Sequence, residues 1–537
     1  MATITRRGVA PQGTGTTTTA PAIAPARTGT SFLPSPPSDH DKLSYLEPHQ
    51  RWVPVVSAFG GLLTIASLVL LVEARPWALP LLPILLLSSA ALVISFLSAR
   101  RKRRDTVASH RAIIESWRPA SIPSVDVFLP SAGEPLDVLD NTYHHVARLE
   151  WNGELRVHVL DDSARSSVKQ LAESYGFIYR SRPDRGHLKK AGNLRHGFDN
   201  STGDIIAVLD ADFVPRPDYL RELVPYLDDQ KLGIVQSPQY FDVDPSMNWV
   251  QHAAGATQIL FYRWIQPSRD ASNAPICVGT CALYRRSALA AAGGFAQIGH
   301  SEDVHTGVQV MNGGYQVRYV PVVLAKGLCP DDLDQFVSQQ YRWCTGSMSL
   351  LRSKPFHAMR LSIMQRVCYW AGFLYYITTG IGVMVVALPP ILMALIAPEA
   401  VEVRNYVLVL LALIVRMGLV PIVTLEKESF FRLTRIQATY SFAHAIALLD
   451  AVRGRADSWQ ATGIRGPRTT TAARVRRLAI ATIATTQVLL WATILWRAPT
   501  FGWIDYAPMA LLAALGLYTL FPLLLWRSGT TTNGARS

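Results

Sequence analysis

The chain has 537 residues and a formal net charge of +13 at pH 7, and 49% of its residues are hydrophobic while only 17% are charged. The length would allow roughly three soluble domains of about 150 residues, but the apolar residues are gathered into long runs, which argues against a fully soluble protein. The five cysteines form no pair of CxxC elements, so the sequence supports neither a zinc site nor a disulfide framework.

The N-terminal segment is rich in Thr, Pro, Ala and Ser and contains no apolar run. This composition is typical of a chain that cannot bury enough apolar surface to fold. It also lacks the apolar centre of a signal peptide. Residues 1–45 are therefore predicted to be a disordered tail.

Six apolar runs follow along the chain. Each has about 20 or more mostly apolar residues, enough for a helix to cross a hydrocarbon core of about 30 Å. The runs cover residues 52–73, 76–98, 367–394, 404–424, 476–497 and 504–526. One run could be the buried helix of a large soluble protein, but six predict pairs of transmembrane helices over 52–98, 366–424 and 476–526.

Basic residues are placed asymmetrically about these runs. Five consecutive basic residues, 100–104, follow the second run, and a cluster of arginines lies between Arg432 and Arg477. By the positive-inside rule, residues 99–365, 425–475 and both termini, including the tail 527–537, are predicted to be cytoplasmic. The protein is thus expected to be a multi-pass protein of the plasma (inner) membrane. Because topology and anionic headgroups account for the positive charge, no nucleic-acid partner is predicted.

The block 99–365 alternates short β-type runs with stretches of helical spacing. Strands are predicted at 125–129, 155–160, 205–209, 232–236 and 281–284. Helices are predicted at 136–149, 164–175, 188–199 and 217–227. This alternation predicts an α/β domain with a mostly parallel sheet and helices on both faces. Ligands of such sheets bind beyond the carboxyl ends of the strands, and the acidic pairs of this chain follow strands directly.

The pair Asp210 and Asp212 follows the third predicted strand. Two carboxylates with one residue between them can share a divalent cation with phosphate oxygens, as Mg²⁺ prefers. The cation would neutralise charge on a nucleotide diphosphate leaving group. A solvated turn is the alternative, but the apolar residues on both sides favour a strand end.

Asp161 and Asp162 follow the second predicted strand. They could form a turn through their own backbone hydrogen bonds, or they could bind a base or ribose. Downstream, Lys190 and Gly192 lie near a predicted helix start, where a small residue beside lysines suits the close approach of a phosphate. An ordinary basic helix start is the alternative for this second motif.

Glu302 and Asp303 follow Ser301 at the start of a helix predicted over 303–313. A placed carboxylate that takes a proton from an acceptor hydroxyl can contribute about 10² to 10⁴ in rate. Ser301 could be the N-cap of this helix. Both interpretations can hold, because a capped helix start would orient the carboxylates.

An amphipathic helix predicted over about 331–351 carries Gln339, Arg342 and Trp343. Their spacing places all three on one face. Trp offers a flat apolar platform for a sugar ring, and Arg can contact a pyrophosphate with two donors. A Trp and an Arg anchored at a membrane interface are the alternative.

Together these elements resemble the processive family 2 glycosyltransferases, most closely cellulose synthase and its relatives. The resemblance covers about residues 120–470, and the flanking apolar runs fit as well. Val125–Pro135, Gln236–Phe241 and Gly279-Thr280 also match. The resemblance implies a Rossmann-like GT-A domain between transmembrane helices, interface helices, and a channel that exports the chain as it grows.

The resemblance also implies roles for individual residues. Asp161 and Asp162 would contact the uridine, and Asp210 and Asp212 would hold uridine diphosphate with Mg²⁺ or Mn²⁺. Asp303 would be the catalytic base, with Glu302 beside it.

The remaining assignments concern the diphosphate and the acceptor. Lys190 and Arg342 would lie near the diphosphate, whereas Gln339 and Trp343 would bind the acceptor end of the polymer. A loose match to the gating loop of the family assigns Thr462 and Arg465, in the 425–475 segment, to the nucleotide sugar.

The sequence thus predicts an inverting transferase that moves glucose from UDP-glucose to a cellulose-like β-glucan and exports it across the bilayer, with export subunits as further partners. Phe213 replaces the His of many cellulose synthases. Other products therefore stay open: glucomannan, β-1,3- or mixed-linkage glucan, chitin or hyaluronan. Transfer of one sugar to a lipid phosphate is a further alternative.

The chain ends soon after the last run, so no β-barrel that binds cyclic di-GMP is expected in it.

Overall fold

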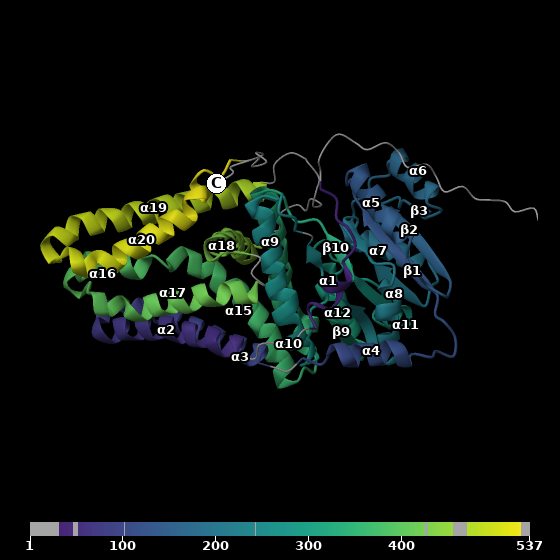
Figure 1. Cartoon of the computed structure of the whole chain (residues 1–537), viewed down its shortest axis with the longest axis horizontal. Helices are drawn as coiled ribbons and strands as arrows, with labels where there is room; N and C mark the ends of the chain where they lie inside the picture. The colour runs from purple at the N-terminus through teal and green to yellow at the C-terminus, as the bar shows by residue number, and fades with distance from the viewer. Residues whose placement is uncertain are drawn as a thin grey trace, which may run out of the picture. The chain divides into compact units, whose positions relative to one another are not determined.

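The computed structural model describes residues 32–46, 52–100, 103–241, 243–424, 428–454 and 470–527. The described residues from Pro34 onward belong to one compact unit. Figure 1 shows the arrangement of the elements, and the contacts described below lie within residues 34–527.

A seven-stranded sheet forms the centre of the α/β domain, which we define as residues 103–330. In order across the sheet, its strands are β3 (Ile178–Arg180), β2 (Leu155–Asp161), β1 (Val125–Ser131), β4 (Ile205–Val208), β8 (Ala282–Arg285), β6 (Leu232–Gln236) and β9 (Gln316–Tyr319). All neighbouring strands are parallel except where β8 pairs with β4 and with β6. The predicted mostly parallel sheet is confirmed, with one reversed strand.

The reversed strand brings a distant loop to the edge where the parallel strands end. Val208 at the end of β4 pairs with Ala282 at the start of β8. The chain therefore enters β8 at the carboxyl edge of the sheet, and the loop residues Gly279 and Thr280 lie beside Asp210. Alternation of strands and helices along the sequence does not reveal this reversal.

Both faces of the sheet are buried. Successive side chains of a strand point to opposite faces, so neighbouring residues of one strand enter different cores. Val127 and Leu129 of β1 belong to one hydrophobic core, and Phe128 between them belongs to another. The helices of the domain are α4 (Val107–Ser116), α5 (Leu136–Val146), α6 (Ser166–Ser174), α7 (Lys189–Asp199), α8 (Tyr219–Leu223), η2 (Val224–Asp228), α9 (Trp249–Ile259), η3 (Leu260–Ile265), α10 (Gln266–Asp270), α11 (Arg286–Ala291) and α12 (Glu302–Asn312). A small second sheet has the order β5 (Phe213–Pro215), β10 (Ala325–Gly327) and β7 (Tyr240–Phe241).

Within the described residues, six helical segments are long and apolar enough to cross a membrane, which confirms the predicted number. They are Val53–Glu73, Pro76–Ala99, Ile363–Ile396, Val403–Val423, Thr470–Phe501 and Trp503–Leu524. Their elements are α2 (Val53–Ala74), η1 (Pro76–Leu81), α3 (Leu82–Ala99), α15 (Ile363–Val385), α16 (Leu388–Ile396), α17 (Val403–Val423), α19 (Thr470–Phe501) and α20 (Trp503–Leu524), with η4 (Pro398–Ala400) between α16 and α17.

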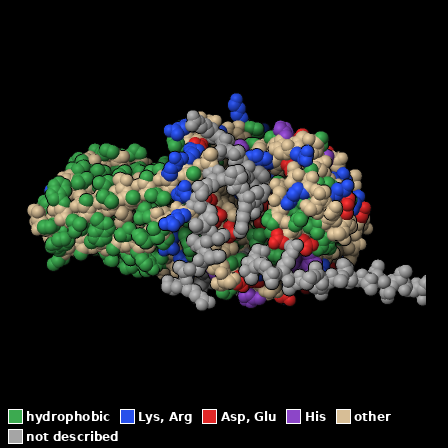
Figure 2. All heavy atoms as spheres, turned by 90° about the horizontal axis from the view of Figure 1, so that it is seen from above, with side chains coloured by type: hydrophobic (Ala, Val, Ile, Leu, Met, Phe, Trp, Pro, Cys, Tyr) green, Lys and Arg blue, Asp and Glu red, His purple; other side chains and the backbone are tan. Residues whose placement is uncertain are grey.

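Three helices connect the span helices to the α/β domain: α13 (Leu333–Leu351), α14 (Lys354–Ala358) and α18 (Phe430–Val452). In Figure 1, α18 is seen nearly end-on, whereas α2, α17, α19 and α20 run across the view. Figure 2 shows a band of Lys and Arg side chains where the mostly hydrophobic surface meets the mixed surface of the α/β domain. The basic band suits anionic headgroups at that level, and the position of α18 at the membrane interface stays a prediction.

The end of the predicted disordered tail is corrected by the structure. Residues 39–43 form helix α1 (Asp39–Leu43), and Tyr45 is buried against Tyr240. Lys42 Nζ pairs with the carboxylates of Asp218 at 2.7 Å and Glu222 at 2.6 Å. These partners lie far along the chain, so local composition could not indicate that this segment docks on the α/β domain.

Candidate active site

The ends of three parallel strands form the acidic edge of the sheet. Ser131 at the end of β1 pairs with Asp161 at the end of β2, so the two strands end level. Asp210 follows β4 in the same sheet, and the loop after β1 carries Glu134. The carboxylates predicted at strand ends therefore meet at one edge.

Asp161 organises the turn that follows β2. Its Oδ1 accepts hydrogen bonds from the Ser163 amide at 2.8 Å and from the Ser163 hydroxyl at 2.5 Å. Its Oδ2 accepts from the Arg165 amide at 3.1 Å and from the Tyr179 hydroxyl at 3.0 Å. The carboxylate is buried and shapes the loop, whereas its contact with a nucleotide stays a prediction.

Asp162 is held by an arginine that sequence reasoning did not select. The Arg182 Nε and Nη2 donate to the two carboxylate oxygens of Asp162 at 2.6 and 2.7 Å. A β-carbon added to Gly192 would lie 2.3 Å from Arg182 Nη1 and 2.4 Å from the His187 carbonyl oxygen. The small residue at 192 thus makes room for Arg182, and the close approach of a phosphate to this segment stays a prediction.

Lys190 links the acidic edge to the reversed strand. Its Nζ lies 2.5 Å from Asp210 Oδ1, donates to the Gly279 carbonyl at 2.9 Å, and lies 3.9 Å from Glu302 Oε1. Burial opposes the charge on Lys190, but Asp210 and Glu302 outweigh it and raise the pKa of the ammonium group above its ordinary value. Lys190 therefore stays charged and holds the two acidic motifs together.

Asp210 and Asp212 form a carboxylate pair whose negative charge the contact with Lys190 offsets only in part. Burial, reinforced by the charge of Asp210, raises the pKa of Asp212 to about 7, and Glu134 adds to this effect. Within the described part of the chain, no group of three or more His, Cys, Asp or Glu side chains is arranged to hold a metal. The pair fits Mg²⁺ or Mn²⁺ as a site completed by diphosphate oxygens and water.

Glu302 and Asp303 form the first turn of α12. Ser301 precedes them in a left-handed conformation, with a φ of 52°, and its hydroxyl makes no cap hydrogen bond. Ser301 is thus the N-cap residue by position only. Burial, with the charge of Glu302, raises the pKa of Asp303 to about 7. A carboxylate with this pKa can accept a proton near neutral pH.

Asp303 lies directly against the backbone of Gly279. A β-carbon added to Gly279, which has a φ of +73°, would lie 2.7 Å from Asp303 Cβ. Thr280 Oγ1 accepts a hydrogen bond from the Asp210 amide at 2.8 Å. The loop before β8 thus contacts both Asp210 and Asp303 and sets their relative position.

Gln339, Arg342 and Trp343 lie on one face of α13 and are half-buried. Burial lowers the pKa of Arg342 to about 10, and the nearby Glu302 opposes this shift. Arg342 therefore faces the acidic turn of α12.

Elsewhere on α13, the Tyr341 hydroxyl donates to Asp450 of α18 at 2.9 Å, and Asp450 pairs with Arg474 of α19 at 2.6 Å. The remaining predicted residues, Thr462 and Arg465, lie outside the described residues.

Comparison with known proteins decides the class of this domain. Residues 126–293 match the family model "Glycosyl transferase family 2". The chain carries a family 2 glycosyltransferase domain. The matched residues contain β1, β2, β4, β6 and β8 with Asp161, Asp162, Lys190, Asp210 and Asp212, whereas α12 and α13 follow the matched region.

Cellulose synthases are among the relatives of this family 2 domain. The chain is 34% identical over 260 residues to the cellulose synthase catalytic subunit [UDP-forming] of Xanthomonas axonopodis pv. citri, covering 47% of this chain and 36% of the relative. It is 32% identical over 257 residues to the cellulose synthase 1 catalytic subunit [UDP-forming] of Komagataeibacter xylinus, covering 47% and 34%. The matched part is thus about a third of the length of these relatives.

Among solved structures, a mannosyltransferase from Pyrobaculum calidifontis in complex with GDP-Man and Mn²⁺ covers 70% of this chain and 99% of its own, with a TM-score of 0.49 and 15% sequence identity. The mixed seven-stranded sheet and the family match together indicate a GT-A architecture for the family 2 domain.

Two residues of the site escaped sequence reasoning for different reasons. Glu134 follows a buried strand, the same signal that selected Asp161 and Asp210, so it could have been found. Arg182 carries no such signal, because its partner Asp162 lies 20 residues away and the fold brings them together.

Proposed function

We propose that this protein is an inverting, metal-dependent and processive glycosyltransferase. It moves glucose from UDP-glucose to the non-reducing end of a cellulose-like β-glucan and exports the product through its span helices. The family match and the cellulose synthase relatives support this proposal.

The observation that carries the proposal is the contact between the strand-end carboxylates and the first turn of α12. Lys190 lies between Asp210 and Glu302, and Gly279 contacts both Lys190 and Asp303. The carboxylates and the lysine that we propose for the nucleotide diphosphate thus adjoin a carboxylate with a pKa of about 7. Transfer from a nucleotide sugar to a hydroxyl needs a diphosphate site and a base close together.

In the proposed reaction, Asp303 takes the proton of the acceptor hydroxyl. The hydroxyl oxygen then forms a bond to the anomeric carbon while the bond from that carbon to the UDP oxygen breaks. UDP departs with the electron pair, and the configuration at the anomeric carbon inverts. No covalent sugar–enzyme bond forms, so no nucleophilic side chain is needed.

The leaving group acquires negative charge as the bond to the sugar breaks. Lys190 and Arg342 are the cations that face this region, and both are held beside Glu302. Asp210 and Asp212 would hold Mg²⁺ or Mn²⁺ together with the diphosphate. When bound, the cation supplies charge neutralisation at the departing oxygens.

The acceptor is proposed to lie against the face of α13 that carries Gln339 and Trp343. Gly346 on this face lies against Ser301 beside the acidic turn, whereas the opposite face of α13 packs in the hydrophobic core shared with α15 and α18. The basic band in Figure 2 supports a multi-pass position in the plasma (inner) membrane with the transferase domain on the cytoplasmic side. Donor binding by Asp161, Asp162, Thr462 and Arg465 belongs to the same proposal.

The deciding experiment uses the purified full chain in lipid, with one radiolabelled nucleotide sugar at a time and linkage-specific digestion of the product. We expect a long β-1,4-glucan from UDP-glucose in the presence of Mg²⁺ or Mn²⁺. Asp303→Asn should abolish synthesis while UDP binding persists. Asp199→Asn, an exposed carboxylate on α7, is the matched control and should retain activity.

Four other outcomes would redirect the proposal. A preference for GDP-mannose or UDP-N-acetylglucosamine as donor would show that the transferred sugar is not glucose. A product that carries a single sugar on a lipid phosphate would show that the protein does not synthesise a polymer. Loss of UDP binding in Asp303→Asn would move Asp303 from base to structural residue, and unchanged polymer length in Trp343→Ala would remove the acceptor role of Trp343.

A further inference from the structure

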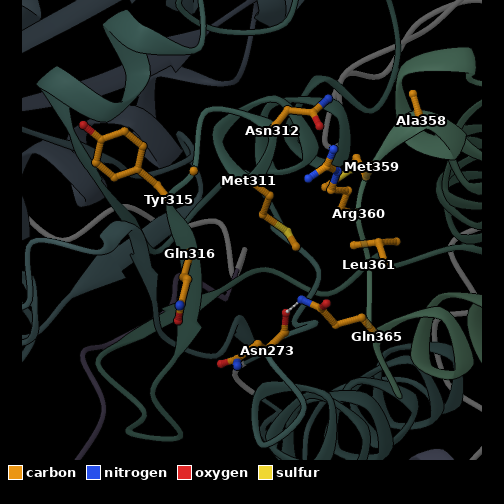
Figure 3. A pocket seen from close by; sticks show the side chains of 11 residues that line it. Asn273, Met311, Asn312, Tyr315, Gln316, Ala358, Met359, Arg360, Leu361 and Gln365 are labelled. Carbon is orange, nitrogen blue, oxygen red and sulfur yellow. Dashed lines mark hydrogen bonds between the residues drawn. The ribbon is translucent and has the colours of Figure 1, made fainter. Parts of the chain in front are cut away.

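A pocket of about 370 Å³ lies between the end of α12, the start of β9 and the segment that leads into α15. Met311 and Asn312 of α12, Gln316 of β9, and Arg360 and Gln365 before and in the first turn of α15 are among its lining residues. Figure 3 shows Arg360 and Asn312 at one end of the pocket, and Gln365 joined to the Asn273 carbonyl at the other by a hydrogen bond of 2.9 Å. The pocket is separate from the acidic edge described above.

The pocket lies at the level where two span helices end. Ser98, one residue before the end of α3, donates to Cys368 Sγ on α15 at 3.6 Å, so the span segment that contains α3 ends level with Cys368. Gln365 precedes Cys368 by three residues, which is about 4.5 Å along a helix. The headgroup layer extends roughly 5–7 Å beyond the hydrocarbon core on each side. The lining residues therefore lie at headgroup depth.

The chemistry of the lining suits an anion. None of the lining residues is acidic, and most of the polar ones are amides, with Arg360 as the cation. Arg104 donates to the side chain of Asn273, and Arg366 lies 3.4 Å from the Met359 carbonyl, so two more guanidinium groups adjoin the wall. In the part of the chain that the structure describes, the side chains of Arg360, Asn312 and Gln316 form no hydrogen bond with another residue, which leaves their donors for a ligand.

We propose that this pocket binds a phosphate ester, supplied by the headgroup of an anionic phospholipid. Arg360 would contact the phosphate, and Asn312 and Gln316 would donate to its oxygens.

Binding here would act on the helix that carries the acidic turn. Met311 and Asn312 end α12, and Glu302 and Asp303 begin it. The Tyr369 hydroxyl of α15 already lies 3.5 Å from Met311 Sδ. A phosphate held between α12 and the start of α15 would fasten the two elements at a second point, so an anionic lipid would steady the position of the acidic turn.

The test measures lipid retention by the full chain. The protein is placed in nanodiscs of phosphatidylcholine mixed equally with phosphatidylglycerol, extracted, and examined by native mass spectrometry. We expect phosphatidylglycerol to be retained, and Arg360→Glu to reduce its occupancy about tenfold or more, as for loss of a charge-assisted hydrogen bond. Gln316→Glu, a smaller change in the same wall, should act in the same direction.

Lys354→Glu is the matched control, because Lys354 is exposed on α14 near the same level but does not line the pocket. Equal loss in Lys354→Glu and Arg360→Glu would overturn the proposal in favour of general surface attraction. In a second arm, glycerol phosphate or inorganic phosphate is added to phosphatidylcholine nanodiscs. Binding of these soluble anions with no retention of phosphatidylglycerol would overturn the lipid source. Unchanged retention in both pocket variants would overturn the site itself.

Discussion

The backbone of Gly346 on α13 lies directly against Ser301, the residue before the acidic turn of α12. A β-carbon built on Gly346 would lie 1.9 Å from Ser301 Oγ. The helix that carries Gln339, Arg342 and Trp343 therefore meets the segment that carries Asp303 at this point. The approach is close enough that no other residue fits at 346 without displacing Ser301.

Gly346→Ala is accordingly expected to displace the first turn of α12. A misplacement of about 1 Å at a reacting group can lower a rate about 10²-fold, so kcat for polymer synthesis should fall by that order while UDP binding persists. Gly382→Ala on α15 is the control, because a β-carbon there meets no atom within 4 Å. Full activity of Gly346→Ala would show that the contact with Ser301 does not position the base.

Gly279→Ala should impair both acidic motifs. An Ala at a φ of +73° costs roughly 1–3 kcal/mol in backbone strain, and its β-carbon would also collide with Asp303. Synthesis should therefore fall strongly, and donor affinity should fall as well because the Gly279 carbonyl orients Lys190. Gly293→Ala separates the two causes, since Gly293 has a φ of +86° but open space around it. If both variants lost activity equally, strain alone would explain the effect.

The pH dependence of the reaction should report the ionisation of Asp303. Its pKa is raised to about 7 by burial and by Glu302, and only the ionised carboxylate can take a proton. The value of kcat/KM should therefore rise as pH increases through about 7. Lys190→Met removes a nearby positive charge and should move this rise to higher pH, whereas Lys231→Met at the surface should not. A rise centred near pH 4 would contradict the assignment.

The ion pair between Asp450 and Arg474 should stabilise the junction of α13, α18 and α19. Arg474→Met would remove the guanidinium group from the buried Asp450, which also accepts from the Tyr341 hydroxyl, and breaking such a pair costs about 3 kcal/mol. The thermal midpoint of the purified protein should fall by several degrees. The double variant Arg474→Met with Asp450→Asn should recover part of the loss, because an amide can still accept from Tyr341. No recovery would mean that the packing of Arg474 is what matters.

Lys42 should hold the N-terminal segment on the α/β domain. Its ammonium group contacts both Asp218 and Glu222 and is mostly shielded from solvent. Lys42→Met should release residues 34–46 and speed chymotrypsin cleavage after Tyr45, which is buried in the intact protein. Lys169→Met on the surface of α6 should leave the cleavage rate unchanged. Equal rates in the two variants would show that the docking rests on Tyr45 instead.

Local patterns in the sequence were sufficient to predict six span segments, the main strands of the sheet, and Asp161, Asp162 and Asp210 at strand ends. Hydrophobic length and side-chain periodicity are properties of short segments, so they can be read without knowing the fold. The same holds for the helix that carries Gln339, Arg342 and Trp343. Residues 34–45 were predicted wrongly to be disordered, because the partners of this segment, Asp218 and Glu222, are remote in the chain.

The tertiary structure alone decided how these elements meet. It reversed β8, which brings Gly279 beside Asp303, and it placed Arg182 on Asp162 and Gly346 on Ser301. It also showed that the Ser301 hydroxyl makes no cap hydrogen bond and that the Arg182 side chain lies against Gly192. Each of these results depends on contacts between segments that are 10 to 70 or more residues apart. Such contacts are selected by the packing of the whole domain, and no local pattern of residue types encodes them.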